Sequence, residues 1–381
     1  MFYSKYQALW PVYIVIFVLS CSHADKITGP IISINVPIDG FKVEVGKSIP
    51  ITPLIVNDNH SSYTWTLNGN VVSLDKILNF NPSKIGNYDI QLKVSNQIGS
   101  DFKTISIKAF SNFSPYITKV FDYKYGPGQH ASIISADWNG SDFIGQPWTG
   151  SKIYTSLGGW GGYIIAGFDH PINNTTGKDF GVFTQPGPGS EPAVISVMSD
   201  VNNDGIPNDG DWLEIKGSEY SNPETIHNYQ VTYLKPTING NVTWNDNLGH
   251  HGELIPGFGS TSWWWSGYGT KAEVVFTGEK LPNAYQNTSN NSGQENWALR
   301  AGLFSFGYGE CYSNLDYNAA LKANLFDLSD CVDKNGHSVT VTNISFIKVQ
   351  SGVFQIAGWL NEISTEVSGA VDLSLIDYPA N

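Results

Sequence analysis

The sequence predicts an all-β protein in two parts, a small N-terminal sandwich followed by a larger jelly-roll-like sandwich. Short runs that alternate apolar and polar residues recur along the chain, with turn residues between them, and this is the period of half-buried strands. Aromatic residues make up 13% of the chain, Gly contributes 39 residues and only 14% are charged. This composition favours a rigid, turn-rich β-protein over a helical or disordered one.

The chain begins with an export signal. Lys5 precedes an apolar run, residues 8–19, that stops at Ser20 and Cys21, which is the layout of a signal peptide over residues 1–20. As a helix these twelve residues rise only ~18 Å, well short of the ~30 Å hydrocarbon core of a bilayer, so we expect no permanent span.

Residues 18–21, Val-Leu-Ser-Cys, resemble the bacterial lipobox, in which the cysteine is acylated and becomes the new N-terminus. We therefore expect lipidation at Cys21, with residues 21–29 as a short polar tether and the lipid as the protein's membrane contact. The alternative is an ordinary secretory signal with an incidental cysteine.

Net charge excludes nucleic acid as a partner. Removal of residues 1–20 removes one lysine and no acid, which leaves 20 basic and 34 acidic side chains, a net charge of −14. Besides Cys21, the chain has two further cysteines, Cys311 and Cys331. An exported protein permits a disulfide between them, and two unpaired buried thiols are the alternative that sequence leaves open.

Residues 30–109 form the first predicted domain. Its alternating runs include residues 32–36, 63–67 and 88–94, at the spacing of a β-sandwich. Asn68-Gly69 suits a tight hairpin turn, and Trp65 is expected in the core between the sheets. These features resemble a PKD-like or Ig-like domain, to which we assign a spacer role.

Residues 116–381 form the second predicted domain and hold ten of the chain's twelve tryptophans. Its apolar stretches have strand length, for example residues 193–197, 229–233 and 345–349. A single jelly-roll-like β-sandwich is the simplest architecture, because no internal repeat argues against it. Residues 318–325 are the one stretch that could form a short helix.

The loop over residues 200–211 predicts a calcium site. Side-chain oxygens at alternate positions, with Gly205 after the third, let a loop curl around a hard cation. The alternative is an acidic turn that needs no metal. The predicted ligands are Asp200, Asn202, Asp204, the carbonyl of Ile206, and Asp209 and Asp211.

Several aromatic and histidine residues are candidates for ligand binding. On a strand, Trp263 and Trp265 would face one side and Trp264 the other, so at least one indole is expected at the surface or in a pocket. Packing of all three between the sheets is the alternative. The full candidate set is Trp148, Trp160, His250, His251, Trp263, Trp264, Trp265 and Tyr268.

Motifs of catalysis are missing from the sequence. It contains no Gly-x-Ser-x-Gly, no His-Glu-x-x-His, no phosphate-binding glycine loop and no Cys-x-x-Cys, which are signatures of common active sites. We therefore expect a protein that binds and does not catalyse.

Long phrases of the second domain resemble a family of Bacteroidota cell-surface lipoproteins, the BtuH-type cobalamin binders. The matching stretches include residues 156–171, 191–200, 211–220 and 357–367. The resemblance implies a lipid-anchored outer-membrane protein at the cell surface that captures cobalamin for a TonB-dependent transporter. His250-His251 and Trp263–Trp265 match no family phrase.

Two classes of function therefore remain open. In the first the protein captures a nutrient, cobalamin first and a glycan second, since both suit a pocket with aromatic walls and a polar rim. In the second it is a structural or adhesive surface protein whose aromatic residues are core.

Overall fold

The computed structural model describes residues 28–128, 139–148, 154–184, 190–237, 241–255, 262–289, 295–312, 315–358, 361 and 363–379, without the side chains of residues 262, 263 and 266. The predicted signal peptide and Cys21 lie outside these residues. Among the described residues no helix is both long and apolar enough to cross a membrane.

The predicted all-β fold is confirmed, beginning with the N-terminal part. Its five-stranded sheet has the order β2-β9-β8-β5-β6, and two pairs, β1 with β4 and β3 with β7, complete it. The strands are β1 (Ile31–Ser33), β2 (Phe41–Glu44), β3 (Ile49–Ile51), β4 (Leu54–Val56), β5 (Ser62–Leu67), β6 (Asn70–Ser73), β7 (Leu78–Phe80), β8 (Gly86–Ser95) and β9 (Ser100–Phe110).

Trp65 and the Asn68-Gly69 turn have the predicted roles. Trp65 is fully buried, and its indole N–H donates to the carbonyl of Asp75 at 3.0 Å. Asn68 and Gly69 have φ angles of 51° and 80°, the left-handed pair that a tight hairpin between β5 and β6 requires. The predicted boundaries, residues 30–109 and 116–381, stay a prediction.

The C-terminal part is built on two facing sheets. The seven-stranded sheet has the order β10-β12-β26-β14-β15-β25, with β22 paired to β14, and the five-stranded sheet has the order β11-β27-β13-β24-β23. Their strands are β10 (Lys119–Lys124), β11 (Thr155–Ser156), β12 (Tyr163–Asn173), β13 (Phe180–Thr184), β14 (Ser190–Met198), β15 (Leu213–Ile215), β22 (Tyr308–Cys311), β23 (Tyr317–Asn318), β24 (Ala323–Phe326), β25 (Cys331–Val332), β26 (Asn343–Ser351) and β27 (Glu366–Asp372).

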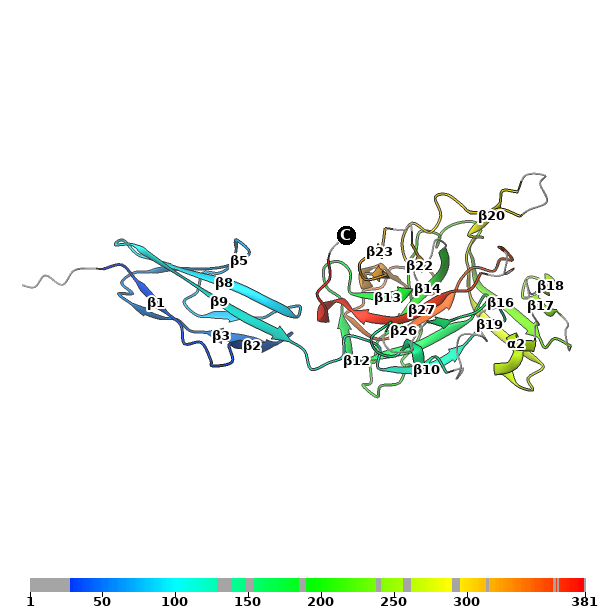
Figure 1. Ribbon diagram of the computed structural model, residues 1–381, viewed down its shortest axis with the longest axis horizontal. Coiled ribbons are helices and arrows are strands. Elements are labelled where there is room, and N and C mark those ends of the chain that lie inside the picture. The colour runs from blue at the N-terminus through cyan, green and yellow to red at the C-terminus, as the bar shows by residue number, and fades with distance from the viewer. Residues whose placement is uncertain are drawn as a thin grey trace, which may run out of the picture. The chain divides into compact units, whose positions relative to one another are not determined.

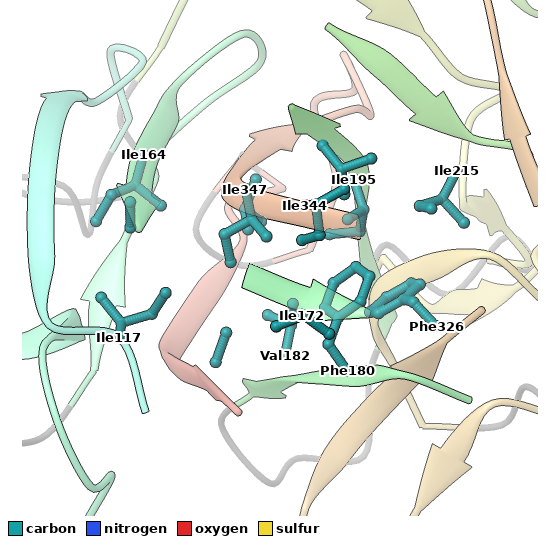
Figure 2. Close-up of a cluster of buried hydrophobic side chains, with 14 of the residues drawn as sticks. Ile117, Ile164, Ile172, Phe180, Val182, Ile195, Ile215, Phe326, Ile344 and Ile347 are labelled. Atoms are coloured by element: carbon teal, nitrogen blue, oxygen red, sulfur yellow. The ribbon is translucent and has the colours of Figure 1, made fainter. Parts of the chain in front are cut away.

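A single apolar core joins these two sheets. Ile195 on β14 and Ile347 on β26 face Phe180 on β13 and Phe326 on β24 (Figure 2), and all four are at most 1% exposed. Phe180 and Phe326 stack with ring centroids 5.2 Å apart. The interior is that of a β-sandwich, in which alternate residues of each strand point inward.

A third sheet adds to the predicted single sandwich. It is four-stranded in the order β18-β17-β16-β19, and Figure 1 shows it beside α2 within the C-terminal part. Its strands are β16 (Ile226–Leu234), β17 (Val242–Asp246), β18 (His251–Leu254) and β19 (Glu273–Lys280), and a hairpin of β20 (Tyr285–Asn287) and β21 (Trp297–Leu299) follows it.

Helical structure in the described part of the chain is limited to single turns, namely α2 (Ser262–Trp265), η1 (Ser141–Phe143), η2 (Ser266–Tyr268), η3 (Leu328–Asp330) and η4 (Leu373–Leu375). The expected short helix at residues 318–325 is wrong, because this segment turns between β23 and β24. β24 pairs with β13, which places Asn324 opposite Val182. Pairing with a neighbouring strand outweighs a local helical pattern of this length.

Candidate ligand-binding cleft

An open cleft with a volume of about 620 Å³ lies beside the third sheet. Three separate stretches of chain line it: the third sheet, the hairpin of β20 and β21, and residues 354–356. Its aromatic lining consists of Tyr229, Trp244, Tyr285, Trp297 and Phe354, and its polar lining of Asp246, His250, Lys280, Asn283, Asn287 and Gln355.

A short turn positions the acidic end of the cleft. Asp246 ends β17, and one oxygen of its carboxylate accepts the amide N–H groups of Leu248 at 2.9 Å and His250 at 2.7 Å. Gly249 has a φ of +88°, a conformation that glycine adopts without strain. The sequence Asp-Asn-Leu-Gly-His therefore closes the hairpin of β17 and β18.

The same carboxylate is the centre of a hydrogen-bond network. Its second oxygen accepts the hydroxyl of Tyr229 at 2.7 Å and lies 2.8 Å from Nδ1 of His250. Burial alone would raise the pKa of Asp246, but these hydrogen bonds and those from the backbone lower it to about 2. Asp246 is thus ionised at neutral pH and suited to holding its neighbours in place.

Trp244 lies against the backbone of β18. A Cβ atom on Gly252 would come within 2.8 Å of Cζ2 of the indole, so glycine at this position lets the ring approach the strand. The ring also meets Phe354 edge to face, with centroids 4.9 Å apart and an angle of 69°. These two aromatic side chains form one wall.

The hairpin of β20 and β21 forms another part of the lining. Asn287 is the register partner of Trp297. Gln355 holds Tyr285 by its backbone, because its Oε1 accepts the Tyr285 N–H at 3.0 Å and its Nε2 donates to the Tyr285 carbonyl at 2.7 Å. Burial raises the pKa of Tyr285 to about 12, so its hydroxyl stays protonated at neutral pH.

The predicted ligand residues fall into three places. His250 lines the cleft, and His251 begins β18 with its side chain exposed. Trp148 is 38% exposed and does not line the cleft; Nζ of Lys322 lies 5.9 Å from the centre of its ring. The remaining described candidates, Trp160, Trp264, Trp265 and Tyr268, belong to one buried cluster.

The strand expected for the three tryptophans is a one-turn helix, α2. Trp264 and Trp265 are 1% and 3% exposed and share the cluster with Tyr125 and Tyr233. Successive side chains of a helix lie about 100° apart, so both rings can face the same core, whereas on a strand they would point to opposite sides. The side chain of Trp263 lies outside the described part of the chain.

Most residues that line the cleft are not among those predicted from the sequence. Trp244, Trp297 and Phe354 stand alone in the sequence and come together through sheet pairing. The available signal was Trp244 beside the turn that starts at Asp246, in the same stretch as His250.

In the loop predicted to bind calcium, two carboxylates accept hydrogen bonds from the loop's own backbone. The carboxylate of Asp200 accepts the amides of Asp204 at 3.1 Å and Gly205 at 2.9 Å, and Asp209 accepts those of Val201 at 2.6 Å and Asn202 at 3.1 Å. The donor set of carboxylate, amide and carbonyl oxygens fits Ca²⁺.

One predicted ligand has another partner. Asp211 accepts from Nζ of Lys334 at 3.1 Å, and both side chains are exposed. Calcium at this loop therefore stays a prediction, with Asp200, Asn202, Asp204 and Asp209 as its best-placed side chains.

Cys311 and Cys331 are buried free thiols, which corresponds to the unpaired alternative. Cys331 belongs to the core between the two large sheets and Cys311 to a separate apolar cluster. Burial raises the pKa of Cys331 to about 12 and that of Cys311 well above its usual value, so both stay protonated at neutral pH.

Comparison with protein families supports the first domain. The PKD-like domain family matches residues 29–96, which confirms the resemblance drawn from the sequence. No curated protein matches the chain. By fold the chain is an all-β protein with an N-terminal PKD-like domain and a C-terminal β-sandwich part.

Three solved structures illustrate the weak likeness to known folds. The first is a quinonprotein alcohol dehydrogenase-like protein from Bacteroides thetaiotaomicron, at 14% identity and a TM-score of 0.21, covering 70% of this chain and 72% of that one. The second is SGBP-B of the Bacteroides ovatus mixed-linkage glucan utilization locus, in complex with a mixed-linkage heptasaccharide: 11% identity, TM-score 0.19, 84% and 99% covered.

The third is a SusE-like protein, at 8% identity and a TM-score of 0.15, with 90% of this chain and 96% of that one covered. TM-scores this low do not define a shared fold, and none of the three matches bears on cobalamin. The function is therefore argued from the cleft itself.

Proposed function

We propose that the C-terminal part binds a carbohydrate in the cleft beside the third sheet. The observation that carries this proposal is the combination of indole faces with amide side chains around one open cavity. Its volume of about 620 Å³ falls within the ~300–1,000 Å³ common for small-molecule sites.

The chemistry of the lining suits sugar rings. The C–H faces of a sugar are apolar and pack on aromatic rings, and Trp244 and Trp297 are half-buried, so each exposes part of its indole. Sugar hydroxyls both donate and accept hydrogen bonds, as do the amide groups of Asn283, Asn287 and Gln355. The lining thus offers stacking and hydrogen bonding together.

The same residues suit binding better than hydrolysis. Asp246 is held ionised with a pKa of about 2, far below the raised value of a carboxylic acid that protonates a leaving group. Its oxygens already accept from Tyr229 and the turn. Its role in this proposal is to hold the cleft in shape.

Cobalamin, the ligand that the sequence resemblance implies, is the second candidate. The observation that favours it is the apolar part of the lining, with Leu254, Phe354 and the 43% exposed side chain of Ile356. A broad apolar ring with polar substituents would contact such a surface.

We further propose the cellular setting. Lipidation at Cys21 would hold the protein on the outer membrane at the cell surface, where it would pass its ligand to a TonB-dependent transporter, with the PKD-like domain as spacer. Protease treatment of intact cells tests this setting, since a fully protected protein would contradict surface exposure.

The test of binding is calorimetric titration of the mature protein, residues 22–381, with a glycan panel and with cyanocobalamin. Trp244→Ala should abolish glycan binding, whereas Trp148→Ala, which removes an exposed tryptophan outside the cleft, should leave it unchanged. Loss of glycan binding in Trp148→Ala but not in Trp244→Ala would refute the assignment of binding to the cleft. If the protein binds cyanocobalamin and no glycan, cobalamin replaces the glycan as the proposed ligand. Binding of neither would favour a structural surface protein.

A further inference from the structure

A second, much smaller cavity adjoins the cleft. The two share Leu254, Phe354 and Gln355 as lining residues. The volume of the small cavity is about 20 Å³, and a cavity needs ~10–15 Å³ by this measure to hold one water molecule. The space therefore has room for one water molecule.

One residue that lines this cavity carries an unsatisfied hydrogen-bond donor. Trp264 lines it and is 1% exposed, and within the described part of the chain its Nε1 has no hydrogen-bond partner. The indoles of Trp160 and Trp265, by contrast, donate to the carbonyls of Glu279 at 3.2 Å and Lys271 at 3.0 Å. A buried donor without a partner is uncommon and points to a bound acceptor.

Other polar groups around the cavity complete the requirements of a water site. Gln355 and Asn361 also line it, and a buried water makes two to four hydrogen bonds. Gln355 uses Oε1 and Nε2 to hold the backbone of Tyr285. Each of these atoms retains capacity for one more hydrogen bond.

We propose that this cavity binds one ordered water, which accepts the Trp264 N–H and bonds to the side chain of Gln355. Trp264 is then a positioning residue for the cleft, because it fixes Gln355 through the water and Gln355 fixes Tyr285. The effect on ligand affinity rests on the proposed carbohydrate-binding function, whereas the water does not.

The substitution Trp264→Phe removes the N–H and keeps an aromatic ring. With a bound water, we expect it to lower the thermal midpoint and to remove the water. It should also lower the affinity for the tightest-binding glycan of the panel by roughly 2- to 10-fold, as expected for one hydrogen bond. The smaller ring costs some stability in either case, but in a dry cavity the substitution deletes an unsatisfied donor, so the midpoint would fall clearly less than in the matched control below.

The matched control is Trp265→Phe, in the next residue of the same helix. It removes an N–H that donates to the protein itself, so it should lower the midpoint while the water and the glycan affinity stay unchanged. A crystal structure of the mature wild-type protein, at a resolution that shows waters, gives a measurement that needs no variant.

Density for a water within hydrogen-bond distance of Trp264 Nε1 supports the site, and a dry cavity overturns it. A water present in the wild type, combined with unchanged glycan affinity in Trp264→Phe, would refute the positioning role. If the wild type binds no glycan, the carbohydrate proposal fails, and the density and the midpoints still decide whether the water site exists.

Discussion

Replacement of Asp246 by alanine should destabilise the C-terminal part by about 3 kcal/mol. The carboxylate is 1% exposed, and its loss leaves the Tyr229 hydroxyl, on a residue that is 2% exposed, without its acceptor. An unpaired buried hydroxyl costs ~1–3 kcal/mol. The loss of the turn hydrogen bonds to residues 248 and 250 adds about 1 kcal/mol, the usual cost of a lost side-chain cap.

Thermal unfolding measures this cost. At about 2–4 °C per kcal/mol for a domain of this size, the midpoint should fall by roughly 6–12 °C. In a Tyr229→Phe background the hydroxyl is already gone, so Asp246→Ala should then cost only the turn, about 1 kcal/mol. An Asp246→Ala protein within about 0.5 kcal/mol of wild type, or an equal cost in both backgrounds, would refute this account of the network.

The remaining predictions concern other parts of the molecule. Gly252→Ala should weaken ligand binding about tenfold with little effect on the midpoint, because the new Cβ displaces the ring of Trp244; calorimetry checks this. If calcium binds the loop, EGTA should lower the melting midpoint of the wild type and leave a variant with Asp200→Ala and Asp204→Ala unchanged. Burial raises the pKa of Glu310 well above its ordinary value. The Glu310 carboxyl therefore stays protonated in the folded protein at pH values where it ionises in the unfolded chain. Its contribution to stability is complete below the unfolded pKa and is lost as pH rises, so Glu310→Gln should flatten the fall in melting midpoint between pH 5 and pH 8.

The sequence was informative wherever a local pattern decides the structure. Alternating runs predicted the strands of the first domain, and Asn68-Gly69 predicted its hairpin, because two-residue turns with positive φ have few alternatives. The buried position of Trp65 followed from the same pattern. In the second domain the alternating and apolar runs predicted a sandwich, which the core around Ile195 and Phe180 confirms.

Non-local pairing decided the rest. The third sheet could not be foreseen, since its strands read as those of the main sandwich until their partners are known. The sequence predicts a strand for the tryptophans at residues 263–265. Packing against the surrounding aromatic cluster favours a helical turn there instead. The cleft depends on residues near positions 244, 285 and 354, and no local spacing links such distant positions.

This distribution of the cleft along the chain affects how the protein acquires it. β12 pairs with β26, with Ile164 opposite Val349, so the central sheet closes only after nearly the whole chain has been synthesised. Native contacts between segments so far apart in sequence form slowly. A fragment that ends before residue 343 would lack β26 and Phe354, so the cleft forms only once these late segments are in place.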